Sequence, residues 1–120
     1  MIELNININN KKTGKLGHGD QANQLVPKQV GALGFQKVVR VSAGPCHTLA
    51  LTAQGRVFSF GNGQNGRLGH GDEQYAFAPR MVVALQHERV IDISAGECHS
   101  LALTDAGRVY FFGYVQHINI

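Results

Sequence analysis

The stretch SAGPCHTLALTAQGRVFSFG, Ser42–Gly61, recurs with few changes as SAGECHSLALTDAGRVYFFG, Ser94–Gly113. The two copies lie 52 residues apart, and so do GKLGHGD at Gly14–Asp20 and GRLGHGD at Gly66–Asp72. Because the offset is constant and no gap is needed, the chain is built from 52-residue repeats. A repeat of this length is typical of a solenoid, a propeller or an array of small units.

Within one repeat, short apolar runs bounded by turn residues indicate strands. The predicted strands are Val38–Ala43, His47–Thr52, Arg56–Phe60 and, after Pro79, a weaker one at Arg80–Leu85. Along the second of these, Leu49 and Leu51 alternate with smaller residues, and Gly55 supplies the turn of a hairpin. Phe58 and Phe60 share one face of the third strand. Four antiparallel strands per repeat and no helical period predict an all-β chain, and four strands are the composition of a propeller blade.

The bulk composition narrows the class of protein. The 120 residues carry a net charge of +3 and only two cysteines, Cys46 and Cys98. Two thiols do not form a disulfide scaffold, so we expect reduced cysteines and a cytoplasmic or nuclear location. The start MIELNININN is not typical of a signal peptide, and no apolar run approaches the ~20 residues of a membrane span. The scattered basic residues disfavour nucleic acid as the main ligand.

The loop GNGQNGRLGHGD, Gly61–Asp72, raises the question of nucleotide binding, because its first glycines have the GxGxxG spacing. That motif needs a helix after the loop, so that the helix N-terminus can hold a pyrophosphate. Arg67–Asp72 has glycine at every second position from Gly69 and does not predict a helix. We therefore interpret Gly61, Gly66, Gly69 and Gly71 as backbone residues with angles that other residues resist, and expect no cofactor.

The pairs Cys46-His47 and Cys98-His99 invite a zinc site or a nucleophile. Adjacent residues on a strand point to opposite faces, so one pair does not aim both side chains at one metal or substrate. The cysteines are expected to be small buried fillers. His70 with Asp72 also invites an acid-base role, but the motif occurs in both copies. We favour a turn in which the aspartate accepts backbone N–H groups, with Leu68 filling the space between blades.

The motifs SAGxxHxLALTxxGRVxxFG and GxxxxGRLGHGD resemble the repeat of the regulator of chromosome condensation family, over Gly14–Gly113. The resemblance implies a seven-bladed β-propeller that mainly binds other proteins, and histidines hydrogen-bonded inside each blade. The repeat framework comprises Gly44, His47, Gly61, Gly66, Leu68, Gly69, Gly96, His99 and Gly113. Residues 1–13 form a non-family segment with a remnant strand, 14–65 the first repeat, 66–113 the second and 114–120 a divergent tail.

The chain supplies about two four-stranded blades, whereas seven need on the order of 360 residues. We therefore expect a partial β-propeller: a fragment or truncated form of a longer protein, or a homo-oligomer whose copies cover the exposed blade faces.

A binding surface should differ between repeats where the framework agrees. The divergent windows supply the candidate contact residues Glu73, Gln74, Tyr75 and Phe77 in one loop, and His87, Glu88 and Arg89 in another. The sequence thus predicts a protein-interaction module, not an enzyme. The resemblance implies a small GTPase or a ubiquitin-pathway protein as partner, and nucleotide exchange on a small GTPase as the alternative function.

Overall fold

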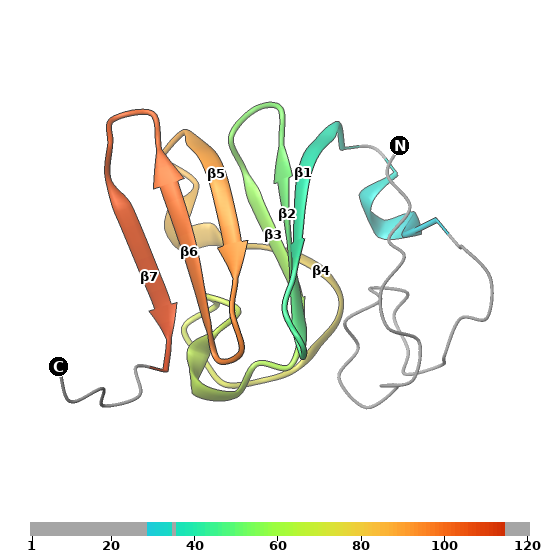
Figure 1. The fold of residues 1–120 in the computed structure, drawn as a ribbon. Coiled ribbons are helices and arrows are strands. Elements are labelled where there is room, and N and C mark those ends of the chain that lie inside the picture. The colour runs from blue at the N-terminus through green and yellow to red at the C-terminus, as the bar shows by residue number, and fades with distance from the viewer. Residues whose placement is uncertain (1–28, 35, 115–120) are drawn as a thin grey trace, which may run out of the picture.

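The computed structural model describes residues 29–34 and 36–114, which form two antiparallel sheets standing side by side (Figure 1). The first sheet has the order β1-β2-β3-β4 and the second β5-β6-β7. The strands are β1 Val38–Ala43, β2 His47–Thr52, β3 Val57–Gly61, β4 Ala76–Met81, β5 Val90–Ala95, β6 His99–Thr104 and β7 Val109–Gly113. Three short 3-10 helices connect them: η1 Gly31–Leu33, η2 Gln64–Gly66 and η3 Val83–Leu85. The all-β prediction is confirmed.

The 52-residue repeat is visible in the structure itself. Each strand from β5 to β7 starts and ends 52 residues after its counterpart from β1 to β3, and η3 follows η1 by the same step. The pairing register is also conserved, since Leu49 opposes Ser59 in the first sheet and Leu101 opposes Phe111 in the second. The two sheets are therefore equivalent blades.

The predicted strand bounds hold for β1 and β2 and are displaced by one residue for β3. The prediction of a fourth strand at Arg80–Leu85 is wrong. The observed strand β4 begins before Pro79 and includes it, and η3 occupies the end of the predicted segment. Proline lacks the N–H that a central strand must donate, so it is confined to edges and irregular positions. β4 provides both, since it is an edge strand of the first sheet and its pairing with β3 is irregular between Ser59 and Gly61.

The two ends of the sheets differ. We call the end with the hairpin turns 53–56 and 105–108 the tip end, and the end with the turns 44–46 and 96–98 and the glycine-rich loop the loop end (Figure 1). At the tip end Gly55 has φ +82° and its N–H donates to the Thr52 carbonyl, as the predicted hairpin requires.

The main hydrophobic core lies between the two sheets. Its buried members are Leu49, Leu51, Val57, Val82, Leu85, Val90, Ile93 and Ala102. A second cluster on the opposite face of the first sheet joins Val30 and Leu33 to Ala50 and Phe60. Both faces of β2 are thus buried, as expected for a blade with neighbours on both sides.

In the part of the chain that the structure describes, the second sheet has three strands rather than the expected four. Its face turned away from the first sheet exposes Leu103, Val109 and Phe111. Several predictions lie outside the described residues: the remnant strand in 1–13, the first LGHGD copy and the tail 115–120. The division into repeats at residue 66 stays a prediction.

Candidate functional site

The glycine-rich loop Gly61–Asp72 leaves β3 at the loop end. Gly61, Gly66, Gly69 and Gly71 all have positive φ, between +75° and +116°. At Gly61 a Cβ atom would also lie 2.6 Å from the carbonyl oxygen of Cys46, so a side chain is excluded there. The loop contains only the three-residue η2, and no helix follows it before β4. Its geometry therefore offers no helix N-terminus for a phosphate.

Arg67 binds this loop to the second sheet. Its side chain is buried, and its guanidinium donates to the carbonyl oxygens of Gln64 at 2.9 Å and Glu97 at 3.0 Å. Its own carbonyl oxygen accepts a hydrogen bond from the Ser100 hydroxyl at 2.7 Å. The connection between the sheets is thus held by buried polar contacts as well as by the core.

His47 completes this connection from the first sheet. Its Nε2 lies 2.8 Å from Ser100 Oγ, so the hydrogen bond expected inside the blade is replaced by one between the blades. Burial, and next the charge of Arg67, lowers the pKa of His47 to about 4, so the ring is neutral at pH 7. Since the Ser100 hydroxyl donates to Arg67, Nε2–H of His47 donates to Ser100. The equivalent His99 instead stacks on Phe111, with ring centroids 5.4 Å apart.

On the first sheet, Ser59 holds the other side of the loop. Its hydroxyl donates to the Leu68 carbonyl at 2.7 Å and lies 2.9 Å from Nε2 of His70. Burial is the main cause that lowers the pKa of His70, followed by the charge of Arg80. Leu68 itself is almost fully buried. His70 therefore binds the framework of its own blade.

Asp72 makes the contact expected of a turn residue. Its Oδ1 accepts a hydrogen bond from the Gln74 N–H at 3.1 Å, and its Oδ2 lies 3.9 Å from the Arg80 guanidinium. Cys46 and Cys98, expected to be small buried fillers, are half-buried free thiols. They lie in the turns before β2 and β6 rather than inside the strands.

The first candidate contact loop lies at the loop end. Glu73, Gln74 and Tyr75 are exposed, and Phe77 is half-buried with its ring centroid 6.4 Å from that of Tyr75. The Glu73 carboxylate accepts a hydrogen bond from the Asn65 N–H at 2.7 Å. This loop therefore presents an aromatic pair beside a fixed carboxylate.

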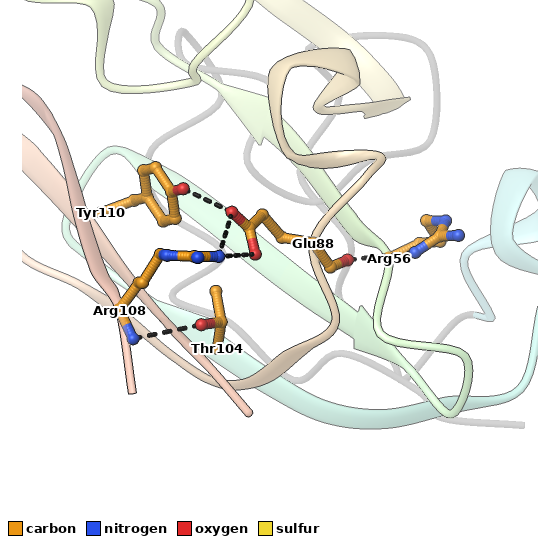
Figure 2. A network of polar contacts seen from close by, with 5 residues as sticks. All are labelled: Arg56, Glu88, Thr104, Arg108 and Tyr110. Atoms are coloured by element: carbon orange, nitrogen blue, oxygen red, sulfur yellow. Dashed lines mark hydrogen bonds and ion pairs between the residues drawn. The ribbon is translucent and has the colours of Figure 1, made fainter. Parts of the chain in front are cut away.

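The second candidate contact loop lies at the tip end, where Glu88 is the centre of a polar network (Figure 2). Its carboxylate accepts hydrogen bonds from the Tyr110 hydroxyl and, at 3.3 Å, from the Arg108 guanidinium. Its carbonyl accepts one from Arg56 at 3.1 Å. The bond to Glu88 is the first cause that raises the pKa of Tyr110.

The backbone of this second loop is also bound on both sides. The N–H of Val90 donates to the Gly55 carbonyl at 3.2 Å, and the N–H of Asp105 donates to the Arg89 carbonyl at 3.0 Å. The loop is thus held by both hairpin turns, while the side chains of His87 and Arg89 are exposed.

The structure does not bring the two candidate loops together. Ala76 opposes Gly61 at the loop end of β4, whereas Met81 opposes Phe58 toward the tip end. One loop precedes β4 and the other follows it, so they lie at opposite ends of the blade. Sequence reasoning missed Arg56 and Arg108 beside the second loop, because they are identical in both repeats and the search looked for differences.

The tip end carries more cations than anions. Lys37 and Arg89 are exposed, and within residues 29–34 and 36–114 neither forms an ion pair. Arg56 binds only a carbonyl there, whereas Arg108 is paired with Glu88. Among the described residues, the carboxylates of this end are Glu88 and the exposed Asp105, against four cations. The loop end instead exposes Asp72, Glu73 and Glu97. The described blades are therefore basic at one end and acidic at the other.

No group of three His, Cys, Asp or Glu side chains that could hold a metal ion occurs among the described residues. Within the same residues, no helix has the length and apolar character to cross a membrane.

Family comparisons match most of the chain. The model described as "Regulator of chromosome condensation (RCC1) repeat" matches residues 10–51 and 54–103, and a second model of this repeat matches residues 38–67. The human E3 ubiquitin-protein ligase HERC2 is 42% identical over 100 residues, which are 83% of this chain and 2% of that protein. Mouse protein RCC2 is 42% identical over 89 residues, which are 72% of this chain and 17% of that protein.

The ultraviolet-B receptor UVR8 of Arabidopsis thaliana is 34% identical over 107 residues, covering 89% of this chain and 24% of that protein. The chain thus spans less than a quarter of the length of these three relatives.

Solved structures show the same fold. Human WBSCR16 has a TM-score of 0.74 and 25% identity, covering 87% of this chain and 27% of that one. Prp20p from Saccharomyces cerevisiae, described with its binding properties to Gsp1p and histones, has a TM-score of 0.74 and 21% identity, covering 86% and 27%. The two sheets therefore form part of a β-propeller.

Proposed function

Because the chain belongs to the regulator of chromosome condensation (RCC1) repeat family, we propose that its blades act as a protein-interaction module rather than as an enzyme. The side chains that first suggested chemistry support this proposal. His47 is buried between the sheets and His70 is bonded to Ser59, so both serve the framework. The variable side chains remain available at the ends of the blades.

The tip end is the contact surface we favour, with His87, Glu88 and Arg89 at its centre. The observation that carries this choice is the network around Glu88, which fixes the loop from three directions while leaving Arg89 exposed. A loop already held in one conformation loses little entropy when a partner binds. The loop at the other end, with Glu73, Gln74, Tyr75 and Phe77, is the second candidate surface.

The charges of the tip end indicate an acidic partner segment. Lys37, Arg56 and Arg89 surround the hairpin turn 53–56 without a carboxylate partner in the described part of the chain. A cationic surface of this kind attracts acidic partners and binds them less tightly as salt screens the charges.

A fluorescein-labelled peptide of alternating Asp and Glu residues provides a direct probe, with a Gln and Ser peptide of equal length for comparison. We expect the acidic peptide to raise the fluorescence anisotropy and to bind less tightly at higher salt. Arg89→Glu should weaken binding by about tenfold, which corresponds to loss of a favourable contact and gain of a repulsive one. Arg80→Glu is the matched control, since it changes the net charge equally but lies on β4.

Equal weakening by Arg80→Glu and Arg89→Glu would show that only net charge matters and would contradict the assignment to the tip end. Binding of the neutral peptide as tightly as the acidic one would contradict the acidic partner. The first of these results would leave the loop end as the remaining candidate surface.

The finer identity of the partner is also part of the proposal. The relatives include an E3 ubiquitin-protein ligase, which supports a ubiquitin-pathway protein, and a small GTPase is the alternative. Release of a fluorescent guanine nucleotide from a panel of small GTPases separates the two. Clear stimulation by this chain would favour nucleotide exchange over plain binding. The free thiols of Cys46 and Cys98 suit the reducing cytoplasm or nucleus, where we place the protein.

A further inference from the structure

The interface between the two sheets shows how one blade of this chain receives the next. β1 and β2 of the first sheet pack against β5 of the second. Leu51 and Val57 supply the receiving face and are 2% and 1% exposed. Val90 and Ile93 of β5 cover them and are 2% and 8% exposed.

Besides the His47–Ser100 hydrogen bond, two polar contacts between β1 and β5 add to this interface. The N–H of Ala95 donates to the Ser42 hydroxyl at 2.9 Å, and Arg40 lies 3.4 Å from Asp92. Both contacts join β1 to β5. The ion pair is largely exposed, so it contributes more to register than to stability.

The receiving face recurs on the second sheet and is open. Leu103 and Val109 stand 52 residues after Leu51 and Val57, yet they are 36% and 66% exposed. They oppose each other across β6 and β7, as their counterparts do across β2 and β3. Phe111, 45% exposed, extends the same face. This surface therefore has the apolar pattern of a buried interface without its cover.

The covering element also recurs, on β1. Val38 and Val41 stand 52 residues before Val90 and Ile93, and Val41 is 38% exposed where Ile93 is 8%. The chain thus presents a second copy of each half of its own interface: the receiving face on the second sheet, and the exposed strand β1 at the edge of the first sheet, beside the buried cluster of Ala50 and Phe60.

The polar contacts are compatible with joining these halves. Ser94, the counterpart of Ser42, is exposed, and so is Ala43, the counterpart of Ala95. In such a contact Asp92 lies on the receiving face and Arg40 on the covering strand, the reverse of their places in the internal interface. The ion pair therefore again joins opposite charges. Like charges at these positions would have opposed the contact.

We propose that the outer face of the second sheet, formed by β5, β6 and β7, binds β1 of a second copy of this chain, head to tail. The contact repeats the internal interface between the blades. It is heterologous, because different surfaces meet, and so it produces a closed ring or an open chain of copies rather than a symmetric dimer. The departures include Phe111 at the position of Ser59, which replaces the hydrogen bond from the Ser59 hydroxyl to the Leu68 carbonyl by apolar contact area. They also include the buried Thr48 at the position of Ser100 and Val41 at the position of Ile93.

Sedimentation velocity over a concentration series tests the proposal with the 120-residue chain. We expect the average mass to rise with concentration in the range of about 10 to 200 µM, typical of modest interfaces. Val109→Glu should abolish the rise by blocking the receiving face, and Val41→Glu should abolish it by blocking the covering strand. Val83→Glu is the matched control, since Val83 is 54% exposed and lies on η3.

The mixture of the two blocked variants gives the sharpest result. Val41→Glu retains an intact receiving face and Val109→Glu retains an intact β1, so together they should form a 1:1 complex of twice the monomer mass. Circular dichroism confirms that each variant folds, and Leu103→Gln replaces Val109→Glu if the latter does not. A wild-type chain that stays monomeric over the series would overturn the proposal. Undiminished association of Val41→Glu would overturn it too, because two receiving faces would then pair with each other.

Discussion

Ser100 joins the two blades through two buried hydrogen bonds, and replacing it gives the most informative stability test. The change Ser100→Ala removes the hydroxyl that donates to the Arg67 carbonyl and accepts from His47 Nε2. Ser100 and His47 are both 0% exposed, so water does not readily replace the lost partner. Leaving a buried polar group unsatisfied costs about 1–3 kcal/mol.

Two such groups are affected, and we expect Ser100→Ala to lower the free energy of unfolding by about 2–4 kcal/mol. That is a large share of the ~5–15 kcal/mol of a typical domain. For a domain of this size the midpoint of thermal unfolding should fall by about 10–25 °C. Urea unfolding followed by circular dichroism, at one low protein concentration, measures the change.

Ser94→Ala is the control, because Ser94 lies on β5 and is exposed. It should change the free energy of unfolding by less than about 0.5 kcal/mol. A double-mutant cycle with His47→Ala isolates the bond itself, and we expect the two losses to be far from additive. If Ser100→Ala behaves like Ser94→Ala, the buried contacts do not stabilise the junction and the reasoning fails.

Three further predictions address other features. The folded-state pKa of His47, about 4, lies below the unfolded value of 6.5. The contribution of neutral His47 to the free energy of unfolding is therefore fully present above pH 6.5. It should decline by up to about 3 kcal/mol as the pH falls to 4, seen as a steeper pH profile in urea unfolding than that of His47→Gln. Gly44→Ala should destabilise by more than about 2 kcal/mol, because its Cβ would lie 2.4 Å from the Gly96 carbonyl oxygen. Gly31→Ala, with nothing within 4 Å, should be nearly neutral in the same thermal melt. Glu88→Ala should lower the raised pKa of Tyr110 in an ultraviolet titration, whereas Glu73→Ala should leave it unchanged.

The strands that could be predicted are those whose own residues carry the pattern. β2 alternates leucines with small residues and ends at a glycine turn, so local sequence defines both its faces and its bounds. β4 has no such pattern, since AFAPRM contains a proline and its side chains are only partly buried. Its position is set by pairing with β3 and not by its own sequence.

The polar contacts of the site were less accessible to sequence reasoning. His47 and Ser100 stand 53 residues apart and meet only because the sheets stack. The unusual backbone conformation at Gly61 could be inferred from the sequence, because a glycine in a loop indicates such a conformation by itself. The cations Arg56 and Arg108 were overlooked because a search for differences between repeats discards what the repeats share.

The step of 52 residues has a consequence for how such a chain changes length. The first sheet is completed by β4, which follows the glycine-rich loop. The boundaries of a sheet along the chain therefore do not coincide with those of the 52-residue sequence repeat. A segment of that length, taken from any starting point, still contains one of each strand type in cyclic order. Duplication or loss between any two equivalent positions would therefore add or remove one complete sheet. Recombination could vary the number of blades without leaving an unpaired strand at the join.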